Sequence, residues 1–472
     1  MRTIETDYLV IGSGAVGLAF ADTLIEQADA HVTLVDCHGQ PGGHWNDAYS
    51  FVTLHQPSAF YGVNSMELGT RRKDTMGFNK GLYELASGPE VAGYFDRVMR
   101  HKLLPSGRVS YHPMSNHLGD GLFESVLSGE RTQVHVRRKV VDATYNSPSV
   151  PSTHRPRFHV APGVRLLPPN ALPQLWSRQH EGGLPRRFVI VGAGKTAMDA
   201  ALWLIGAGAK PAAISWVVPR DSWLVNRVTT QPGVEFFTEA IGGQADQMQA
   251  LATATSIDDL FLRLEACGTV LRIHRDHTPS MFHLATVTPA EADVLRGIGQ
   301  VIRLGRVQAI DADGLVLDRG RVPMAAGTLY IDCTASAVEP RPIQPIFQGN
   351  KLVLQIVRLP QPAFSAALVA WVEAHHEGDD DDTQKNRLCG TVPFPHTLRD
   401  YAQSMMVSMR NQLHWGQDKD LRQWIRNSRL DGFGKIIAGI DAQDTHKQAI
   451  VARMREQAAA AAVNLPKLMA AR

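Results

Sequence analysis

The sequence predicts an α/β fold with two Rossmann-like dinucleotide-binding units. Two segments have the pattern of a buried strand, a glycine-rich turn and a helix, one at Gly12 to Gly17 and one at Gly192 to Ala197. Asp36 ends the strand after the first helix, where such a unit presents an acid to a ribose. The 472 residues leave room for two or three packed domains.

The elements of the first unit follow in order. Tyr8 to Ile11 is a short apolar run that predicts a strand; a segment with helical spacing comes next, and Val32 to Val35 predicts a second strand. Residues 89–104 have helical spacing again. The alternating run Val134 to Tyr145 predicts further strands, and we assign Val141 within it to the cofactor site.

The second unit repeats this order. Phe188 to Val191 predicts a strand, a helix follows the glycine turn, and Ile214 to Val218 predicts the next strand. Residues 235–298 are predicted to be mostly helical, an insertion that either covers a substrate site or is a structural extension. Leu329 to Asp332 is typical of another buried strand, and residues 396–472 are predicted to be helical.

Composition excludes several classes of function. The 48 Lys and Arg against 46 Asp and Glu give a net charge of +2, so no overall field favours nucleic acid or an anionic membrane. We find no signal-peptide pattern and no run near the roughly 18 apolar residues of a membrane helix, so we expect a soluble, cytoplasmic protein. Four cysteines without a CxxC pair argue against disulfides and a redox dithiol, and the histidine spacing predicts no metal site.

The first glycine turn has the composition of a pyrophosphate site. Its glycines allow a tight turn and close approach of the backbone, and the helix N-terminus attracts a phosphate. Asp36 can accept hydrogen bonds from a ribose. The residues assigned to this turn are Gly12, Gly14, Gly17 and Asp36.

The second turn fits the GxGxxA variant of the same motif. Arg220 follows the next strand, where a cation pairs with a 2′-phosphate, so we expect NADPH rather than NADH. Asp221 is adjacent and Arg227 is a rival cation. The residues assigned to this turn are Gly192, Gly194, Lys195, Thr196 and Arg220.

Gly42-Gly43-His44-Trp45 is similar to the GGxW element of the class B flavin-dependent monooxygenases. The resemblance implies that the first unit holds FAD, with Gly43, His44 and Trp45 among its contacts. It also implies that the second unit holds NADPH and is inserted in the FAD domain. The expected division is FAD domain 1–175, NAD(P)H domain 176–325 with the insertion 235–298, FAD domain again 326–390, and a helical C-terminal region 391–472.

Two features depart from that family. Thr328 to Ser336 resembles its strand with an Asp and an Ala-Thr-Gly pattern, but Ser336 stands in place of glycine; Ala335 is assigned to the cofactor site. The linker pattern FxGxxxHxxxW/Y is absent before the second turn. Control of oxygen chemistry by NADP, which that linker implies, is therefore not carried over.

Two further segments supply candidate pocket residues. His55, Gln56 and Tyr61 follow the GGHW element in a polar and aromatic loop, and by chain order in the resembled fold they lie near the flavin; the alternative is ordinary core packing. Gln355 and Ser365 flank the start of an apolar helix whose N-terminus would face the flavin, or which simply packs on the sheet.

These observations predict an FAD-dependent, NADPH-using monooxygenase that transfers one atom of O2 to a small organic substrate. One alternative is an NAD(P)H-dependent flavin reductase or dehydrogenase without oxygenation. Another is a flavin-binding redox sensor without turnover. Homo-oligomer formation is left open by the sequence.

Overall fold

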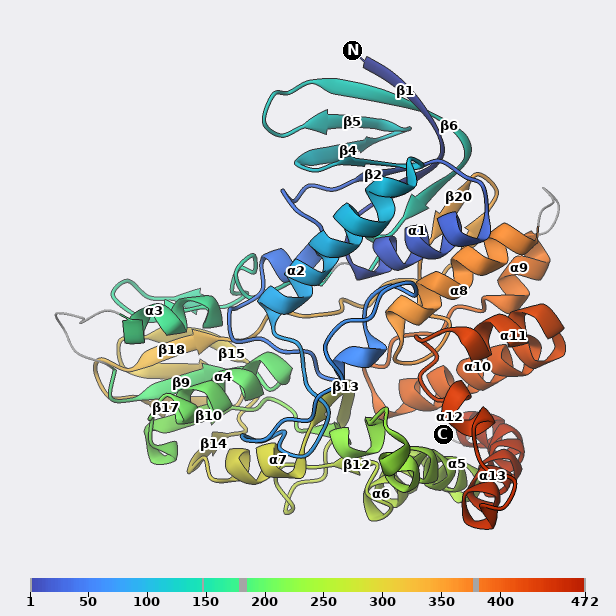
Figure 1. The fold of residues 1–472 in the computed structure, drawn as a ribbon. Coiled ribbons are helices and arrows are strands. Elements are labelled where there is room, and N and C mark those ends of the chain that lie inside the picture. Colours follow the sequence, from blue (N-terminus) through green and yellow to red (C-terminus); the bar gives the residue numbers. More distant parts are fainter. Residues whose placement is uncertain (1, 147, 178–184, 377–381, 471–472) are drawn as a thin grey trace.

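The computed structural model describes residues 2–146, 148–177, 185–376 and 382–470. Two units, each built on a mainly parallel sheet, lie one above the other in Figure 1, and the C-terminal helices, at the right, pack against the first unit and residues 235–298. The predicted class, α/β with two Rossmann-like units and an added helical region, is confirmed.

The first unit is a sheet of eight strands with the core order β19-β20-β6-β1-β2-β3. β1 lies between β2 and β6, both parallel to it, so the carboxyl ends of these strands meet at one edge. Helices α1 and α8 pack together within the hydrophobic core of this unit. The bounds are β1 (Arg2–Ile11), β2 (Val32–Val35), β3 (Val109–His112), β4 (Ser115–Gly119), β5 (Leu122–Ser125), β6 (Arg131–Asp142), β19 (Phe347–Gln348), β20 (Lys351–Val353), α1 (Ala15–Gln27), α2 (Gly88–Val98) and α8 (Pro362–His375).

The second unit has a five-stranded parallel sheet in the order β14-β10-β9-β18-β8, with a four-stranded sheet, β17-β16-β15-β7, packed against it. Its main helix, α4, begins directly at the second glycine turn. The bounds are β7 (His159–Val160), β8 (Arg165–Leu167), β9 (Phe188–Val191), β10 (Ile214–Val217), β14 (Gln300–Ile302), β15 (Val307–Asp311), β16 (Gly314–Leu317), β17 (Gly320–Pro323), β18 (Leu329–Asp332), α3 (Leu172–Ser177), α4 (Lys195–Gly206) and α7 (Pro289–Arg296).

The strand Leu329–Asp332 lies in the second unit, not in the first as the expected division at residue 325 requires. It pairs in parallel with β9. The residue that follows it, Cys333, lies so close to Gly192 that a Cβ on Gly192 would be 2.5 Å from the Cys333 carbonyl oxygen. β8 was likewise expected in the first unit, and it pairs with β18. The boundaries expected at 175 and 325 are therefore wrong, because each separates a strand from its sheet.

A third, smaller sheet and the remaining helices form the rest of the molecule. The insertion 235–298, predicted to be mostly helical, contributes two strands, β12 and β13, beside its helices. Helix α13 packs along α5 of this insertion, as Figure 1 shows. The bounds are β11 (Ser222–Asn226), β12 (Val270–Leu271), β13 (Met281–Val287), α5 (Gly243–Thr253), α6 (Ile257–Ala266), α9 (Asp382–Leu388), α10 (Leu398–Gln417), α11 (Lys419–Asn427), α12 (Gly434–Ala438) and α13 (Thr445–Ala470).

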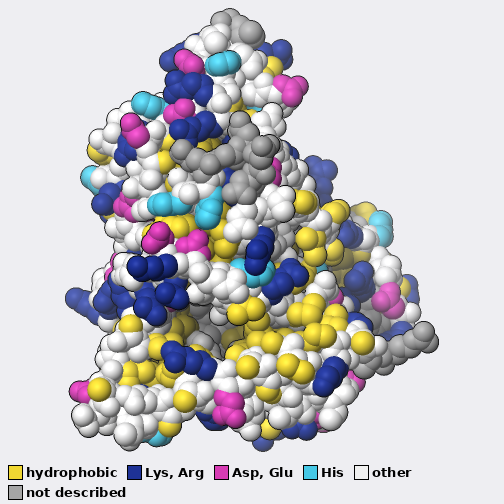
Figure 2. Space-filling model, turned by 90° about the vertical axis from the view of Figure 1, so that its right-hand side faces the viewer, with side chains coloured by type: hydrophobic (Ala, Val, Ile, Leu, Met, Phe, Trp, Pro, Cys, Tyr) yellow, Lys and Arg dark blue, Asp and Glu magenta, His cyan; other side chains and the backbone are white. Residues whose placement is uncertain are grey.

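The surface on the side of the C-terminal helices carries mixed charge. Figure 2 shows Lys and Arg interspersed with Asp and Glu over its upper half, and apolar side chains gathered around a hollow in its lower half. Both signs of charge are therefore present on the described part of this face, in keeping with the net charge of +2. None of the helices in the described ranges combines the length and the apolar character that crossing a membrane requires.

Arg227 joins the two units through a buried guanidinium. Its Nε donates to the His55 carbonyl oxygen at 2.9 Å, and its terminal nitrogens reach the Thr286 carbonyl oxygen at 3.2 Å and the Glu291 carboxylate at 3.0 Å. Only 1% of the residue is exposed. These bonds therefore fix the loop that carries His55 against β13 of the third sheet and α7 of the second unit.

We expect Arg227→Met to lower the free energy of unfolding by about 3–5 kcal/mol, because it leaves the Glu291 carboxylate buried without its partner. The matched control is Arg263→Met, whose ion pair with Asp259 is solvent-exposed; that loss should cost below about 1 kcal/mol. Urea unfolding of both variants measures the difference. Equal small losses would show that Arg227 does not hold the units together.

Candidate functional site

The first glycine turn joins β1 to α1 with closely packed backbone. Gly12 has a φ of +98°, and a Cβ on Gly17 would lie 2.0 Å from the Gly12 carbonyl oxygen. Gly14 caps α1 without a side-chain hydrogen bond, so the first N–H groups of the helix are left for a ligand. The turn also contacts the GGHW segment, where a Cβ on Gly43 would lie 3.0 Å from the Gly14 Cα.

Asp36 reaches this turn from the end of β2. Its carboxylate accepts hydrogen bonds from the Ser13 N–H at 2.5 Å and the Ser13 hydroxyl at 2.8 Å. It also accepts from the His38 N–H at 2.8 Å and contacts the His38 Nδ1 at 2.9 Å. The carboxylate is buried and its hydrogen-bonding capacity is fully used within the protein.

The GGHW segment forms a short 3-10 helix, η1 (Gly43–Asn46), and an aromatic wall. Trp45 Nε1 donates to the Tyr61 hydroxyl oxygen at 2.8 Å, and the two rings meet edge to face. The His44 ring packs against Trp45. Burial lowers the pKa of His44 to about 4, so the ring is neutral at pH 7, and burial raises the pKa of Tyr61.

His55 and Gln56 lie in the loop that Arg227 holds. Burial lowers the pKa of His55 well below its usual value, and the positive charges of Lys195 and Arg227 lower it further. His55 is therefore a neutral hydrogen-bonding group beside the second glycine turn. This loop brings the two units into contact, and His55 and Gln56 line the cavity described below.

The second glycine turn has the same geometry as the first. Gly192 has a φ of +121°, and Gly194 caps α4 without a side-chain hydrogen bond. Lys195 turns back onto its own helix in an ion pair with Asp199, which also accepts a hydrogen bond from the Tyr49 hydroxyl of the first unit at 2.8 Å. The cation is thus held at the contact between the two units.

Arg220 stands at the edge of the second unit with a second cation, Arg306. Burial and the charge of Arg306 lower the pKa of Arg220. Its acidic neighbour Asp221 points elsewhere, because it pairs with Arg303 through two hydrogen bonds of 2.8 and 2.9 Å. Arg227, the rival cation, is the buried link described above. Arg220 and Arg306 therefore form a positive edge from which Asp221 is turned away.

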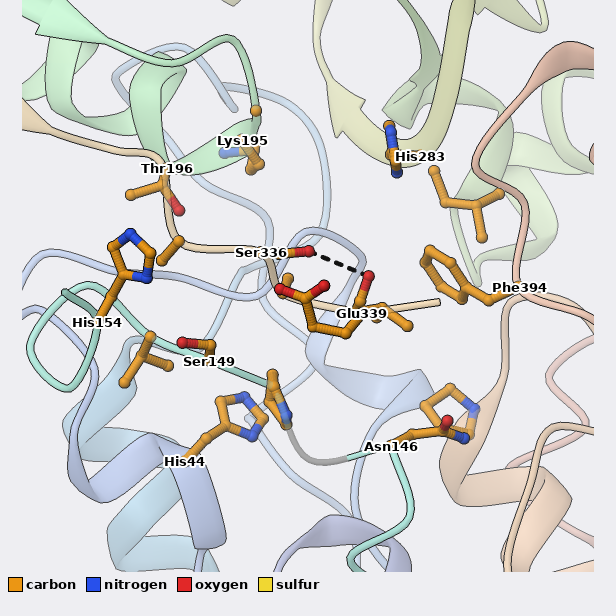
Figure 3. Close-up of a pocket in the computed structure, with 18 of the residues that line it drawn as sticks. His44, Asn146, Ser149, His154, Lys195, Thr196, His283, Ser336, Glu339 and Phe394 are labelled. Atoms are coloured by element: carbon orange, nitrogen blue, oxygen red, sulfur yellow. Dashed lines mark hydrogen bonds between the residues drawn. The ribbon is translucent and has the colours of Figure 1, made fainter. Parts of the chain in front are cut away.

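Both turns open into one cavity of about 2110 Å³. Figure 3 shows Lys195 and Thr196 of the second unit across the cavity from His44 of the first. Most residues assigned from the sequence line it, namely Gly12, Gly14, Asp36, Gly43, His44, Trp45, His55, Gln56, Tyr61, Gly192, Gly194, Lys195, Thr196, Arg220, Ala335 and Gln355.

Three assigned residues do not line the cavity. Gly17 serves the packing of α1 on the turn, and Val141 is fully buried in β6 between β1 and β20. Ser365 does not cap α8, whose N-cap is Gln361. Its hydroxyl donates to the Gln361 carbonyl oxygen at 2.7 Å and accepts from the Val357 N–H at 3.1 Å. These two hydrogen bonds stabilise the loop that precedes α8.

The sequence did not reveal a further part of the cavity wall, to which His283, Phe394 and His396 contribute. His283 of β13 and His396 before α10 stand with their rings 5.4 Å apart, next to Phe394. Burial, His396 and Arg220 lower the pKa of His283 to about 4. Leu284, beside them, has a φ of +59°, an uncommon conformation that only the structure reveals. Strand β13 of the insertion therefore contributes to the cavity wall, and no residue of its helices α5 and α6 is among the lining residues.

Comparison with known proteins finds relatives that are similar in sequence and a solved structure with a similar fold. An NAD(P)-binding Rossmann-like domain matches residues 10–69. The uncharacterized protein Rv2000 of Mycobacterium tuberculosis and the uncharacterized protein Mb2023 of Mycobacterium bovis are each 45% identical over 99% of this chain and 85% of their own length. The polycyclic ketone monooxygenase of the fungus Thermothelomyces thermophila superposes with a TM-score of 0.50 at 13% identity, over 98% of this chain and 89% of that one. The predicted flavin monooxygenase-like fold is confirmed.

Proposed function

The chain belongs to one family with these mycobacterial proteins, and we propose that it is an FAD-dependent, NADPH-using monooxygenase. It transfers one oxygen atom from O2 to a small organic substrate. One observation carries the proposal: two dinucleotide-type glycine turns open into the same cavity. Its volume of about 2110 Å³ is roughly twice the upper end of the 300–1,000 Å³ range of sites for one small ligand.

The first turn fits FAD. The uncapped N-terminus of α1 suits a pyrophosphate, and the contact between Gly14 and Gly43 keeps side chains out of its path. Asp36 is placed for a ribose, and Trp45 with Tyr61 forms an apolar wall suited to a flavin ring. The structurally similar fungal protein is a polycyclic ketone monooxygenase, in agreement with the proposed reaction.

The second turn fits NADPH. Its uncapped helix α4 suits the pyrophosphate, and Arg220 with Arg306 offers two cations to a 2′-phosphate. NADH would leave this positive edge without a counter-charge. The engagement of Asp221 with Arg303 removes the acid that would repel the phosphate.

A bound flavin supplies the chemistry of hydride acceptance and of oxygen activation. The chain surrounds the aromatic wall with neutral rings, since His44 and His55 are uncharged at pH 7. Neutral rings orient a polar substrate by hydrogen bonds without protonating it. Tyr61 keeps its proton because burial raises its pKa, so its hydroxyl remains a donor.

One experiment separates this proposal from its two alternatives. The visible absorbance of the purified yellow protein is followed under anaerobic NADPH and then in air, together with product formation from candidate substrates. A monooxygenase bleaches, recovers in air and yields oxygenated product. A reductase bleaches and recovers without product, and a redox sensor without turnover does not bleach with NADPH.

Gly14→Val should give a folded protein without FAD, because the added side chain occupies the path of the pyrophosphate. The backbone itself tolerates the change, since Gly14 has a φ of −77° and a Cβ at this position would lie 3.5 Å from the nearest atom, the Gly43 Cα. Circular dichroism and flavin absorbance measure the two properties separately. A full complement of FAD in this variant would disprove the assignment of the first turn.

Arg220→Ala should weaken NADPH binding by about 10- to 100-fold and leave NADH binding nearly unchanged, since a charge-assisted bond to phosphate contributes about 1.5–3 kcal/mol. Arg321→Ala, which removes an exposed arginine paired with Asp311, is the control and should change neither. Dissociation constants for both nucleotides decide the matter. An equal loss for both, or an unmodified protein that prefers NADH, contradicts the role of Arg220.

His55→Ala and Gln56→Ala should retain FAD and its reduction by NADPH and lose product formation by about 10-fold or more, because pocket polarity acts on the oxygen-transfer step. Rates of flavin reduction and product yield are measured side by side. If both variants form product at the normal yield, the loop serves packing alone.

A further inference from the structure

A compact polar cluster closes the end of β2. The His38 ring lies between two carboxylates, with Nδ1 at 2.9 Å from Asp36 and Nε2 at 2.8 Å from Asp47. Asp47 is itself anchored, since its carbonyl oxygen accepts from the Ser152 hydroxyl at 2.6 Å and from Asn170 Nδ2 at 3.2 Å. His38 thus bridges Asp36 and Asp47 beside the first turn, and we call this bridge of three residues the clasp.

The hydrogen bonds of Asp36 fall into two kinds. A carboxylate accepts about four hydrogen bonds, and all four positions of Asp36 are taken. Two donors are backbone N–H groups, of Ser13 and His38, which the turn and the strand end fix in place. The other two are side chains that have other partners: the Ser13 hydroxyl also lies 3.5 Å from the Tyr111 hydroxyl, and His38 also contacts Asp47.

A ribose at this site would donate two hydroxyl groups to Asp36, but all the acceptor positions of Asp36 are already used. We propose that the Ser13 hydroxyl and the His38 ring occupy the places of the two ribose hydroxyls, so that His38 competes with the dinucleotide for Asp36. This inference rests on the proposed FAD site at the first turn. His38 is then a positioning residue that sets the affinity of the site rather than a group that takes part in the reaction.

Charge determines how firmly the clasp holds. Burial lowers the pKa of His38, but hydrogen bonds and charge from Asp47 and Asp36 outweigh it and raise the pKa above its usual value. The other titratable groups around it are the Cys37 thiol, whose pKa burial and Asp36 raise, and the neutral His44. Protonated His38 donates to both carboxylates, whereas the neutral ring has one N–H and loses one of the two bonds.

The sign of the pH dependence follows. Below the pKa of His38 the clasp is charged and holds Asp36, so FAD binds weakly. As the pH rises through that pKa the clasp weakens and FAD binds more tightly, by up to about tenfold per pH unit because one proton is released for each FAD bound.

The test is a titration of the flavin-free protein with FAD between pH 6 and pH 9, followed by quenching of flavin fluorescence. The unmodified protein should bind FAD more tightly as the pH rises. His38→Ala should bind tightly already at pH 6 with no such dependence. Asp47→Asn should move the transition to lower pH, because His38 loses one of the carboxylates that raise its pKa.

Two controls complete the design. Ser13→Ala removes the competitor that does not titrate, so it should tighten binding at every pH and keep the slope. His135→Ala removes an exposed histidine of β6 beside Glu5 and should behave as the unmodified protein.

A slope that persists in His38→Ala, or FAD binding that weakens in that variant at all pH values, overturns the inference and leaves the FAD site intact. Failure of the folded, unmodified protein to bind FAD at any pH overturns the proposed function, and the inference with it.

Discussion

The buried guanidinium of Arg227 is the interaction on which the arrangement of the site depends. It holds the His55 loop of the first unit against β13 of the third sheet and α7 of the second unit, at a place where an unpaired charge would be costly. The Tyr49 hydroxyl adds a second link by bonding to Asp199 on α4. These contacts make one cavity out of two units that each present a glycine turn, and hydride transfer between two dinucleotides requires such a shared space.

The cavity is lined by neutral and by charged side chains. His44 and His55, which burial keeps neutral, stand with the Trp45–Tyr61 wall. Charged groups line it as well, among them Asp36 with His38 at the first turn, Arg220 with Arg306 at the second unit, and Lys195 and Glu339. The two uncapped helix N-termini that open into it suit two ligands that carry phosphates.

The parts of the fold that the sequence predicted are set by local patterns. The residues assigned to the two glycine turns, with Asp36 and Arg220, follow from the order of strand, turn and helix, and all of these assigned residues line the cavity except Gly17, which packs behind the turn. Leu329–Asp332 was recognised as a buried strand but placed in the wrong unit, because burial alone does not tell which sheet a strand joins. His283 and His396 lie over 100 residues apart in the chain, so only tertiary packing brings their rings together.

A crystal structure of the protein grown with FAD and NADP⁺ tests the central claim most directly. The account predicts two dinucleotides, one with its pyrophosphate at Gly14 and one at Gly194, whose flavin and nicotinamide rings meet within the cavity beside His44 and His55. Density for a single dinucleotide spanning both turns, or for an NADP⁺ bound outside the cavity, would contradict it.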